Sequence, residues 1–341
     1  MSDFRSDTVT RPSAAMREAM ASAEVGDDVL DGDPTVEALQ EFAANWVGKE
    51  RALFVPSGTM ANQIALGSWT RPGDEIIAEA GSHIVNYEAG ATGYLHGLQT
   101  RTLRGTKGAL DADEVRAALQ PASIHCPNTT LVCVEQTHMG SGGRVVPLKA
   151  LQGVHQVAYS AGIPVHMDGA RLANAVAASG IAAREWAATA DSVSICLSKG
   201  LGAPVGSIIA GNSEFIERAM LVRKRLGGWM RQSGIIAAAG RIALEENVER
   251  LKEDHELAKM LAQKLDAFDV LNVPPDEVES NLVMVGVSDS RFDAASLADA
   301  LDGHGVHVMP LGEKVLRFVT HMDVGPEDVE RLDAAMLEIL G

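Results

Sequence analysis

The sequence predicts an α/β protein with a mainly parallel sheet, helices on both faces of that sheet and a smaller α+β domain at the C-terminus. Between about residues 35 and 215, short apolar runs alternate with Ala-rich amphipathic segments. After about residue 240, a long charged segment of helical period is followed by short strands. Repeated strand, helix, strand order favours parallel pairing, because a parallel connection needs a crossover that a helix usually supplies.

The expected strands of the large domain are its short apolar runs: 51–57, 74–79, 130–136, 162–168, 191–198 and 205–211. The clearest helices cover 37–47 and 170–180, and Gly180 is expected to end the second. A single helix is expected over 241–268, followed by strands at 281–287, 307–310 and 315–321. We therefore expect a large domain over 1–245, with an N-terminal arm over 1–35, and a small domain over 246–341. Ligands bind at the carboxyl ends of the strands in such sheets.

Composition narrows the function classes. The 341 residues carry 29 basic and 46 acidic side chains, a net charge of −17, which disfavours nucleic acid and anionic membranes as partners. The three cysteines show no CxxC spacing and have apolar neighbours, so buried thiols in a reducing cytoplasm are expected. The N-terminus lacks the pattern of a signal peptide, and no apolar stretch of 18 residues occurs.

Lys199 follows an apolar run in LSKGLGAPVGS (197–207), which places its amine at the carboxyl end of a strand. Desolvation lowers the pKa of a lysine and makes it nucleophilic, as Schiff-base chemistry requires. An exposed loop lysine would give the same local pattern.

Asp168 ends the preceding strand in GIPVHMDGAR (162–171), 31 residues before Lys199. One crossover helix fits in that interval, so both side chains can reach one pocket. An aspartate there can pair with the pyridine nitrogen of a lysine-bound cofactor and keep it protonated. The alternative is an aspartate that caps the following helix.

The segment FVPSGTMANQ (54–63) predicts a strand followed by a helix that begins near Ser57, Gly58 and Thr59. Free backbone N–H groups and small residues at a helix N-terminus favour an anion such as phosphate. By contrast, MGSGGR (139–144) lacks the glycine spacing of a dinucleotide site and is expected to form a loop.

Two histidines flank expected strands. His83 follows the strand at 74–79, and His125 precedes the strand at 130–136. An imidazole can stack on a ring or exchange protons near neutral pH, although each could also be a hydrogen-bonded structural histidine. His166 and His307 alternate within strand patterns and are expected to be packing residues.

A set of segments distributed over residues 4 to about 325 closely resembles the L-threonine aldolase family, including its low-specificity and L-allo-threonine members. These segments are FRSDTVTRP (4–12), GDDV (26–29), DPTV (33–36), FVPSGTMANQ (54–63), EQTH (135–138), HMDGAR (166–171), SKGLGAPVGS (198–207), GGWMRQSG (227–234) and LRFVTH (316–321). The resemblance implies the aspartate-aminotransferase-like fold, known as fold type I, and pyridoxal 5′-phosphate (PLP) as cofactor. It implies reversible cleavage of threonine to glycine and an aldehyde, and a homo-oligomer, a dimer of dimers. The chain departs from the family at Leu30, commonly tyrosine, and at Gln136, commonly asparagine.

Roles for individual residues follow from the same resemblance. PLP would be bound covalently to Lys199, stacked under His83 and paired through its nitrogen with Asp168. The cofactor would be further held by Gly58, Thr59, Arg171, Lys224 and Arg231. Ser6, Arg171 and Arg317 would bind the substrate carboxylate, and His83 or His125, directly or through water, would remove the β-hydroxyl proton.

Three other functions stay open at this stage. A metal-dependent aldolase would use histidine and aspartate ligands, but no HxH or HExxH spacing supports a metal site. A related PLP enzyme that performs β-elimination or transamination would keep the same lysine and aspartate. A binding protein without catalysis is the third alternative.

Overall fold

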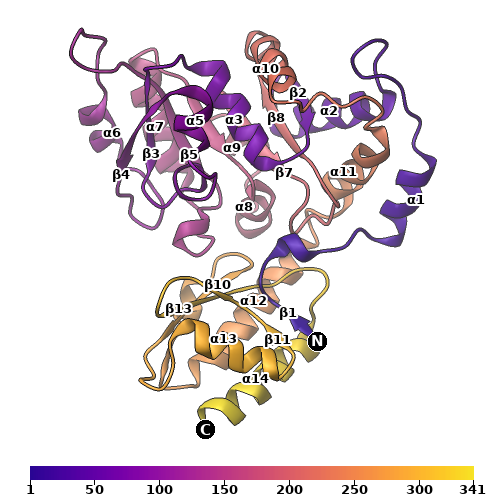
Figure 1. Cartoon of the computed structure of the whole chain (residues 1–341), viewed down its shortest axis with the longest axis vertical. Helices are drawn as coiled ribbons and strands as arrows, with labels where there is room; N and C mark the ends of the chain where they lie inside the picture. Colours follow the sequence, from indigo (N-terminus) through magenta and orange to yellow (C-terminus); the bar gives the residue numbers. More distant parts are fainter.

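The computed structural model describes residues 1–341 and shows a large α/β domain above a smaller domain (Figure 1). The large domain contains a seven-stranded sheet in the order β2-β8-β7-β6-β5-β3-β4. Its strands are β2 (Arg51–Val55), β3 (Glu75–Glu79), β4 (Gln99–Leu103), β5 (Thr129–Glu135), β6 (Val165–Asp168), β7 (Ser192–Cys196) and β8 (Ser207–Gly211). Strand β8 runs in the opposite direction to the other six strands, so the predicted α/β class and mainly parallel sheet are confirmed.

Strand β4 was not predicted. Its sequence QTRTL has no fully buried residue, because β4 lies at the edge of the sheet and pairs only with β3. An edge strand needs little apolar side chain, so hydrophobic periodicity gave no signal there.

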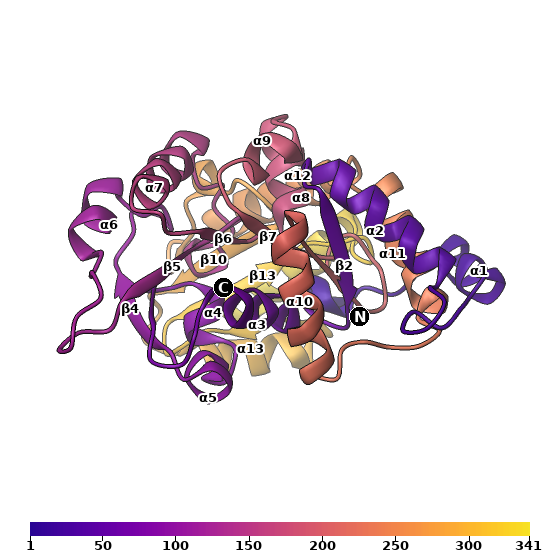
Figure 2. The same ribbon diagram turned by 90° about the horizontal axis from the view of Figure 1, so that it is seen from above.

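Helices cover the two faces of the large sheet. Figure 2 shows α7, α8 and α9 on one side of it and α3, α5 and α10 on the other. The helices of this domain are α1 (Ala14–Ser22), α2 (Pro34–Val47), α3 (Gly58–Trp69), α4 (His83–Asn86), α5 (Ala91–His96), α6 (Ala112–Ala118), α7 (Leu148–Ser160), α8 (Leu172–Ser179), α9 (Ala183–Ala187), α10 (Ser213–Arg225) and α11 (Gly234–Glu246). Gly180 ends α8 with a φ of 72°, as its sequence position predicted.

The single helix predicted over 241–268 is two helices. Helix α11 ends at Glu246, and α12 (Leu251–Asp266) begins after a turn. In that turn the Asn247 side-chain amide donates to the Leu201 carbonyl at 2.8 Å, which fixes the break against the large domain. Helix α12 then packs Leu261 into the hydrophobic core of the small domain. The sequence pattern did not predict this break, because charged and apolar residues keep a helical period throughout 241–268.

The small domain has a four-stranded antiparallel sheet in the order β12-β13-β10-β9. Its elements are β9 (Leu271–Asn272), β10 (Leu282–Val287), α13 (Ala294–Gly303), β11 (Val306–His307), β12 (Met309–Pro310), β13 (Val315–Val319) and α14 (Pro326–Leu340). A separate core of buried aliphatic side chains with Phe318 holds these elements together.

The N-terminal arm begins in the small domain. Strand β1 (Ser2–Asp3) pairs in parallel with β11, and Phe4 is fully buried with its ring 6.3 Å from that of Phe318. In Figure 1 the indigo start of the chain lies beside these C-terminal elements, and the chain then continues to α1 in the large domain. The expectation that the whole arm 1–35 belongs to the large domain is therefore wrong for its first residues.

Of the three cysteines, Cys133 and Cys196 are buried, whereas Cys126 is exposed, contrary to expectation. None of the helices is both long enough and apolar enough to cross a membrane.

Candidate active site

A cavity of about 180 Å³ lies where the carboxyl ends of β5, β6 and β7 meet the start of α3. Most of its lining is polar or charged, which is unusual for a buried space and indicates a binding site. The lining residues are Gly58, Thr59, Asn62, His83, Glu135, Thr137, Met139, Asp168, Ala170, Arg171, Cys196, Ser198 and Lys199.

Lys199 and Asp168 come to this cavity from neighbouring strands. Asp168 is the last residue of β6 and lies in register with Ser194 of β7, and Lys199 follows shortly after β7. The Lys199 amine forms no hydrogen bond or ion pair within the chain, so it is free to react. The two side chains that the sequence singled out therefore share one pocket.

The Asp168 carboxylate is buried and held in place. It accepts hydrogen bonds from the Asn62 amide at 2.8 Å and from the Ala170 N–H at 3.0 Å. Burial raises the pKa of Asp168, but the positive charges of His83 and Lys199 and these hydrogen bonds outweigh it, so the net shift is downward. Asp168 does not cap α8: the N-cap residue of this helix is Arg171, and there is no side-chain cap hydrogen bond. The carboxylate is thus ionised and faces the cavity.

The N-terminus of α3 leaves donors free for an anion. Ser57 caps the helix by accepting from the Met60 N–H at 3.2 Å, and no acceptor in the chain takes the N–H of Gly58 or Thr59. The buried hydroxyl of Ser207 has no partner either, and a Cβ at Gly58 would lie 3.6 Å from it. Free N–H groups at a helix N-terminus, together with an unpaired buried hydroxyl beside them, fit a phosphate.

His83 closes the cavity at the first turn of α4. Its Nδ1 lies 2.9 Å from Glu88 Oε1, and its backbone N–H donates to Glu135 Oε2 at 2.6 Å. Burial lowers the pKa of His83, but the Glu88 hydrogen bond and the Asp168 charge outweigh it, and the net shift is upward. Because Glu88 is an acceptor, the Nδ1 of His83 carries a proton, and its Nε2 remains free for a ligand.

The two arginines expected to bind a carboxylate lie close to each other. Arg171 is buried and donates from Nε and Nη2 to the two oxygens of Asp7, at 2.8 and 2.7 Å. Arg317 donates to the Arg5 carbonyl at 3.0 Å and keeps a buried Nε without a partner. Burial, followed by the charge of Arg171, lowers the pKa of Arg317. Asp7 pairs with Arg171 alone, and Arg317 has no carboxylate partner in the chain, so the positive charge of Arg317 is available for an anionic ligand.

Ser6 lies between Arg5 and Asp7, the residues that contact the two arginines. Its hydroxyl caps the short helix η1 (Asp7–Val9) by accepting from the Thr8 N–H at 3.2 Å. The arm therefore brings Ser6 to the arginine side of the site, although Ser6 does not line the cavity.

His125 does not lie in the pocket of its own chain. It is exposed on the loop before β5 and lines a different surface depression together with Gly73 and Gln99, beside the amino ends of β3 and β4. The cavity, by contrast, lies at the carboxyl ends of the strands. His125 therefore does not line the cavity of its own chain, and its role as a base stays a prediction.

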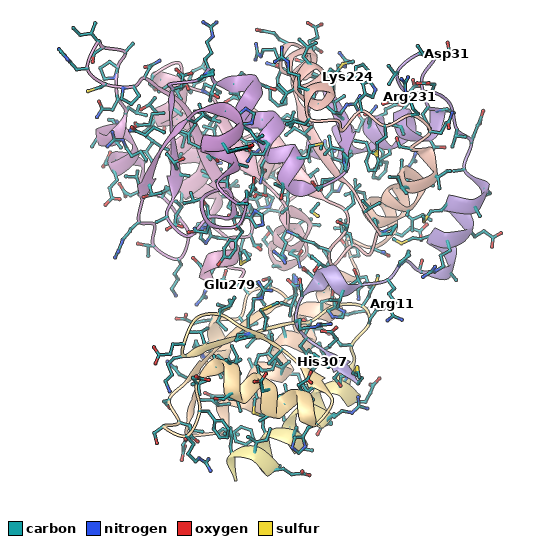
Figure 3. All side chains as sticks on the ribbon, viewed as in Figure 1. Arg11, Asp31, Lys224, Arg231, Glu279 and His307 are labelled. Atoms are coloured by element: carbon teal, nitrogen blue, oxygen red, sulfur yellow. The ribbon has the colours of Figure 1, made fainter.

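Lys224 and Arg231 also lie away from the cavity. Both are exposed, and Figure 3 shows them with Asp31 at the upper right of the large domain. Arg231 pairs with Asp27 at 3.1 Å, and the Lys224 amine lies 5.9 Å from the centre of the Trp229 ring. Neither can hold a cofactor in the pocket of its own chain.

A metal centre fits the site poorly. His83, Glu88 and Asp168 offer ligand atoms within 4.8 Å of one another. However, the Glu88 carboxylate already accepts from Asn62 and Gln63 at 2.7 and 2.6 Å, in addition to facing His83. A cation would have to displace these buried donors, so the donor set favours the hydrogen-bonded arrangement over metal ligation.

A larger groove of about 570 Å³ lies on the outer side of α2. It is lined by several carboxylates, among them Glu37, Glu41 and Glu50, and contains no histidine, cysteine or lysine. Size alone does not make a site, and the smaller cavity holds the chemically competent groups.

Sequence reasoning missed part of the site. Asn62 and Glu88 stand within the quoted motifs FVPSGTMANQ and GSHIVNYEAG, but nothing in their spacing showed that they meet. Asp7 and Glu135 were also inside quoted segments. His166, expected to be a packing residue, instead contacts Asn62 at 3.1 Å. A buried polar residue in a strand that ends at a site was the available signal.

Comparison with known proteins adds the family. A model of the beta-eliminating lyase family matches residues 3–288. The chain belongs to this family.

Several relatives match the chain almost from end to end. A probable low-specificity L-threonine aldolase of Arabidopsis thaliana is 43% identical over 333 residues, covering 96% of this chain and 94% of the relative. The low specificity L-threonine aldolase of Escherichia coli K12 is 42% identical and covers 98% of both. The solved structure of Leishmania major threonine aldolase, at 20% identity, superposes with a TM-score of 0.86 over the full length of both chains. The resemblance to threonine aldolases and their fold is confirmed.

Proposed function

We propose that this protein is a PLP-dependent, low-specificity L-threonine aldolase that cleaves threonine or allo-threonine to glycine and an aldehyde. The observation that carries the proposal is that a free lysine amine, Lys199, and a buried ionised aspartate, Asp168, line one cavity at the ends of adjacent strands. The names of the relatives support the substrate and the reaction.

The residues of the cavity fit PLP. Lys199 would attach to the cofactor covalently, and the free N–H groups of Gly58 and Thr59 would hold its phosphate. Asp168 would pair with the pyridine nitrogen, and the His83 ring would lie against the cofactor. When bound, PLP supplies an electron sink for the pair of electrons released at the substrate Cα.

The arginine side of the site would fix the substrate carboxylate. Arg171 is already oriented by Asp7 and lines the cavity, and Arg317 contributes the unpaired charge. A carboxylate held from one side sets the rotation of the substrate, so that its Cα–Cβ bond can be held perpendicular to the cofactor ring. That orientation selects cleavage of the Cα–Cβ bond.

His83 is the proposed base for the β-hydroxyl proton. Its Nδ1 faces Glu88, which leaves Nε2 as the acceptor toward the cavity. Transfer of the hydroxyl proton to Nε2 lets the aldehyde carbonyl form as the Cα–Cβ bond breaks. Among the residues of one chain, no other histidine lines the cavity.

Residues that the sequence assigned to the site but that lie outside it are proposed to act on a second copy of the chain. His125, Lys224 and Arg231 are all exposed. Large apolar side chains are exposed on the same surfaces, including Ile124 at 95% and Leu221 at 59%. Such side chains favour burial against another copy, which is consistent with the expected dimer of dimers. The cytoplasmic location stays a prediction from the sequence.

The test is incubation of the purified, PLP-loaded protein with L-threonine and separately with L-allo-threonine. Equal amounts of glycine and acetaldehyde are expected. Ammonia with a keto acid would instead indicate β-elimination, and conversion of an added keto acid to an amino acid would indicate transamination. Either result in place of glycine would contradict the proposal.

A further inference from the structure

Asn62 occupies a central position among the buried polar groups behind the cavity. Its side chain is 2% exposed, and every polar atom of the amide has partners. The Nδ2 donates to Glu88 Oε1 at 2.7 Å and to Asp168 Oδ2 at 2.8 Å. Its Oδ1 faces His166 Nε2 at 3.1 Å and accepts from the Ser194 hydroxyl at 3.0 Å.

These contacts allow only one orientation of the amide. Both Glu88 and Asp168 are carboxylates, so the nitrogen of Asn62 must face them, since an oxygen there would meet two acceptors. The oxygen of Asn62 then faces His166, whose Nε2 must carry the proton.

The hydrogen bonds on the far side of His166 agree with this direction of donation. His166 Nδ1 lies 3.0 Å from the Ser192 hydroxyl, and that hydroxyl accepts from the Trp69 Nε1–H at 2.9 Å. A tryptophan can only donate, so Ser192 can direct its own proton to His166. Burial lowers the pKa of His166 to about 4, which keeps this ring neutral at ordinary pH.

On the cavity side, the donors to Glu88 determine which ring nitrogen of His83 carries the proton. Glu88 is satisfied as an acceptor by Asn62 and Gln63, and its remaining contact is His83 Nδ1 at 2.9 Å. A carboxylate surrounded by donors has no proton to give, so His83 must donate from Nδ1.

We propose that Asn62 is a positioning residue that joins the two ionisable sides of the active site. By donating from one nitrogen to Glu88 and to Asp168, it keeps the proton of His83 on Nδ1 and keeps Asp168 ionised toward the cofactor. This inference rests on the proposed function and adds a residue whose side-chain amide acts through Glu88 and Asp168.

Other charges surround both groups and must be considered in any measurement of pH dependence. Those that act on His83 are Glu88, Asp168 and Lys199. Those that act on or are affected by Asp168 also include Cys133, Glu135 and His166. None of the changes proposed below alters these groups.

The adjacent residue Gln63 supplies a matched control. It lies on the same helix, is 2% exposed, and donates from Nε2 to Glu88 Oε2 at 2.6 Å. It makes no contact with Asp168. Asn62→Ala therefore removes a donor from both carboxylates, whereas Gln63→Ala removes a donor from Glu88 alone.

The experiment uses the full-length, PLP-loaded protein with ¹⁵N-labelled histidine, with the His83 signals assigned from a His83→Gln variant. In both variants Glu88 loses a neutral hydrogen-bond donor, so its carboxylate attracts the proton of His83 more strongly. The titration midpoint of His83 is therefore expected to rise by about one pH unit. The visible absorbance band, which reports the Asp168 side, is expected to shift its maximum or its pH dependence in Asn62→Ala and to stay unchanged in Gln63→Ala.

An unshifted His83 titration and an unshifted band in folded Asn62→Ala would overturn the proposal. Equal changes of the band in both variants would also overturn it, because they would indicate a general packing defect. If circular dichroism shows that Asn62→Ala is unfolded, Ser194→Ala removes the hydroxyl that donates to Asn62 Oδ1 at 3.0 Å and also lies 3.4 Å from Asp168 Oδ1, and it should produce a smaller change in both readouts. The His83 titration is then the deciding readout, because Ser194 makes no hydrogen bond to Glu88 or His83. No change there would count against the proposal. Because neither readout is a rate, a failed assay for glycine formation would contradict the proposed function without deciding this inference.

Discussion

Asp7 and Arg171 form a buried, bidentate ion pair, with Nε–Oδ2 and Nη2–Oδ1 distances of 2.8 and 2.7 Å. Asp7 belongs to the N-terminal arm and Arg171 lies at the start of α8, so the ion pair connects the arm to a residue that lines the cavity. Asn281 of the small domain adds a third contact by donating to Asp7 at 3.1 Å. The orientation of Arg171, which we propose to bind the substrate carboxylate, thus depends on both domains.

Replacement of Asp7 should destabilise the protein in a pH-dependent way. Burial raises the pKa of Asp7, but Arg171, Lys199 and Asn281 lower it far below its ordinary value. The carboxylate therefore stabilises the fold above its unfolded pKa of about 3.9, and this contribution falls as the pH drops toward the folded pKa. Asp7→Asn should lose about 3–5 kcal/mol of unfolding free energy at pH 7. Urea unfolding at pH 7 and at pH 4 or below should show a smaller difference between variant and parent at the lower pH; a constant difference would contradict this account.

Lys199→Arg should abolish threonine cleavage and the borohydride-stabilised link to PLP. Arginine keeps the positive charge beside Asp168 and Asp7 but cannot form a Schiff base, so the variant separates charge from chemistry. Mass spectrometry after borohydride reduction measures the link. A covalent PLP adduct on another residue would show that Lys199 is not the attachment point.

Asp168→Asn should retain the fold and lose activity by about 100-fold or more, the magnitude typical for loss of a preorganised charge at a reacting centre. An amide cannot hold the cofactor nitrogen protonated. Steady-state rates of glycine formation measure the effect, with thermal unfolding as the check on the fold. Near-parental turnover would mean that Asp168 serves only to hold Asn62 and Ala170.

Arg317→Ala should raise the KM for threonine by about 10- to 100-fold, in line with the loss of a charged hydrogen bond. PLP affinity should stay close to the parental value, because Arg317 does not line the cavity that we propose to hold the cofactor. Arg291→Ala provides the matched control, since Arg291 is exposed and pairs only with groups of the small domain. A similar KM in both variants would remove Arg317 from the carboxylate site.

Mixing of inactive variants should restore activity if subunits complete each other's sites. Lys199→Ala and Lys224→Ala oligomers, each nearly inactive alone, should regain a fraction of the parental rate after subunit exchange, because a mixed pair contains one site with both lysines. The same experiment with Lys199→Ala and His125→Ala tests the loop before β5. If Lys224→Ala or His125→Ala is fully active by itself, that residue has no role in a second copy's site.

The strands and the two main site residues could be predicted because buried parallel strands carry a strong local signal. Each apolar run ends at a polar residue, and parallel geometry sends those ends to one edge. The same geometry explains why His125 lies away from the cavity of its own chain: a residue that precedes a parallel strand lies at the amino edge, opposite that cavity. That argument was available from the sequence.

Other features depend on contacts between distant segments. Asn62 meets His166 and Asp168 across more than one hundred residues of chain, and no periodicity encodes such a meeting. The break at Asn247 depends on the Leu201 carbonyl in another segment. Hydrophobic pattern describes local structure, whereas these positions are determined by tertiary hydrogen bonds.

The pairing of β1 with β11 has a consequence for the order of folding during synthesis. Ser2 and Phe4 leave the ribosome first, yet Val306 and Phe318, which bury them, are made only after some three hundred further residues. At about 5–20 residues per second, this interval is on the order of tens of seconds. During that time the large domain can assemble its sheet, but Asp7 has no completed small domain to hold the arm in place. The nascent chain therefore completes most of the lining of its cavity before it acquires the alignment of Arg171.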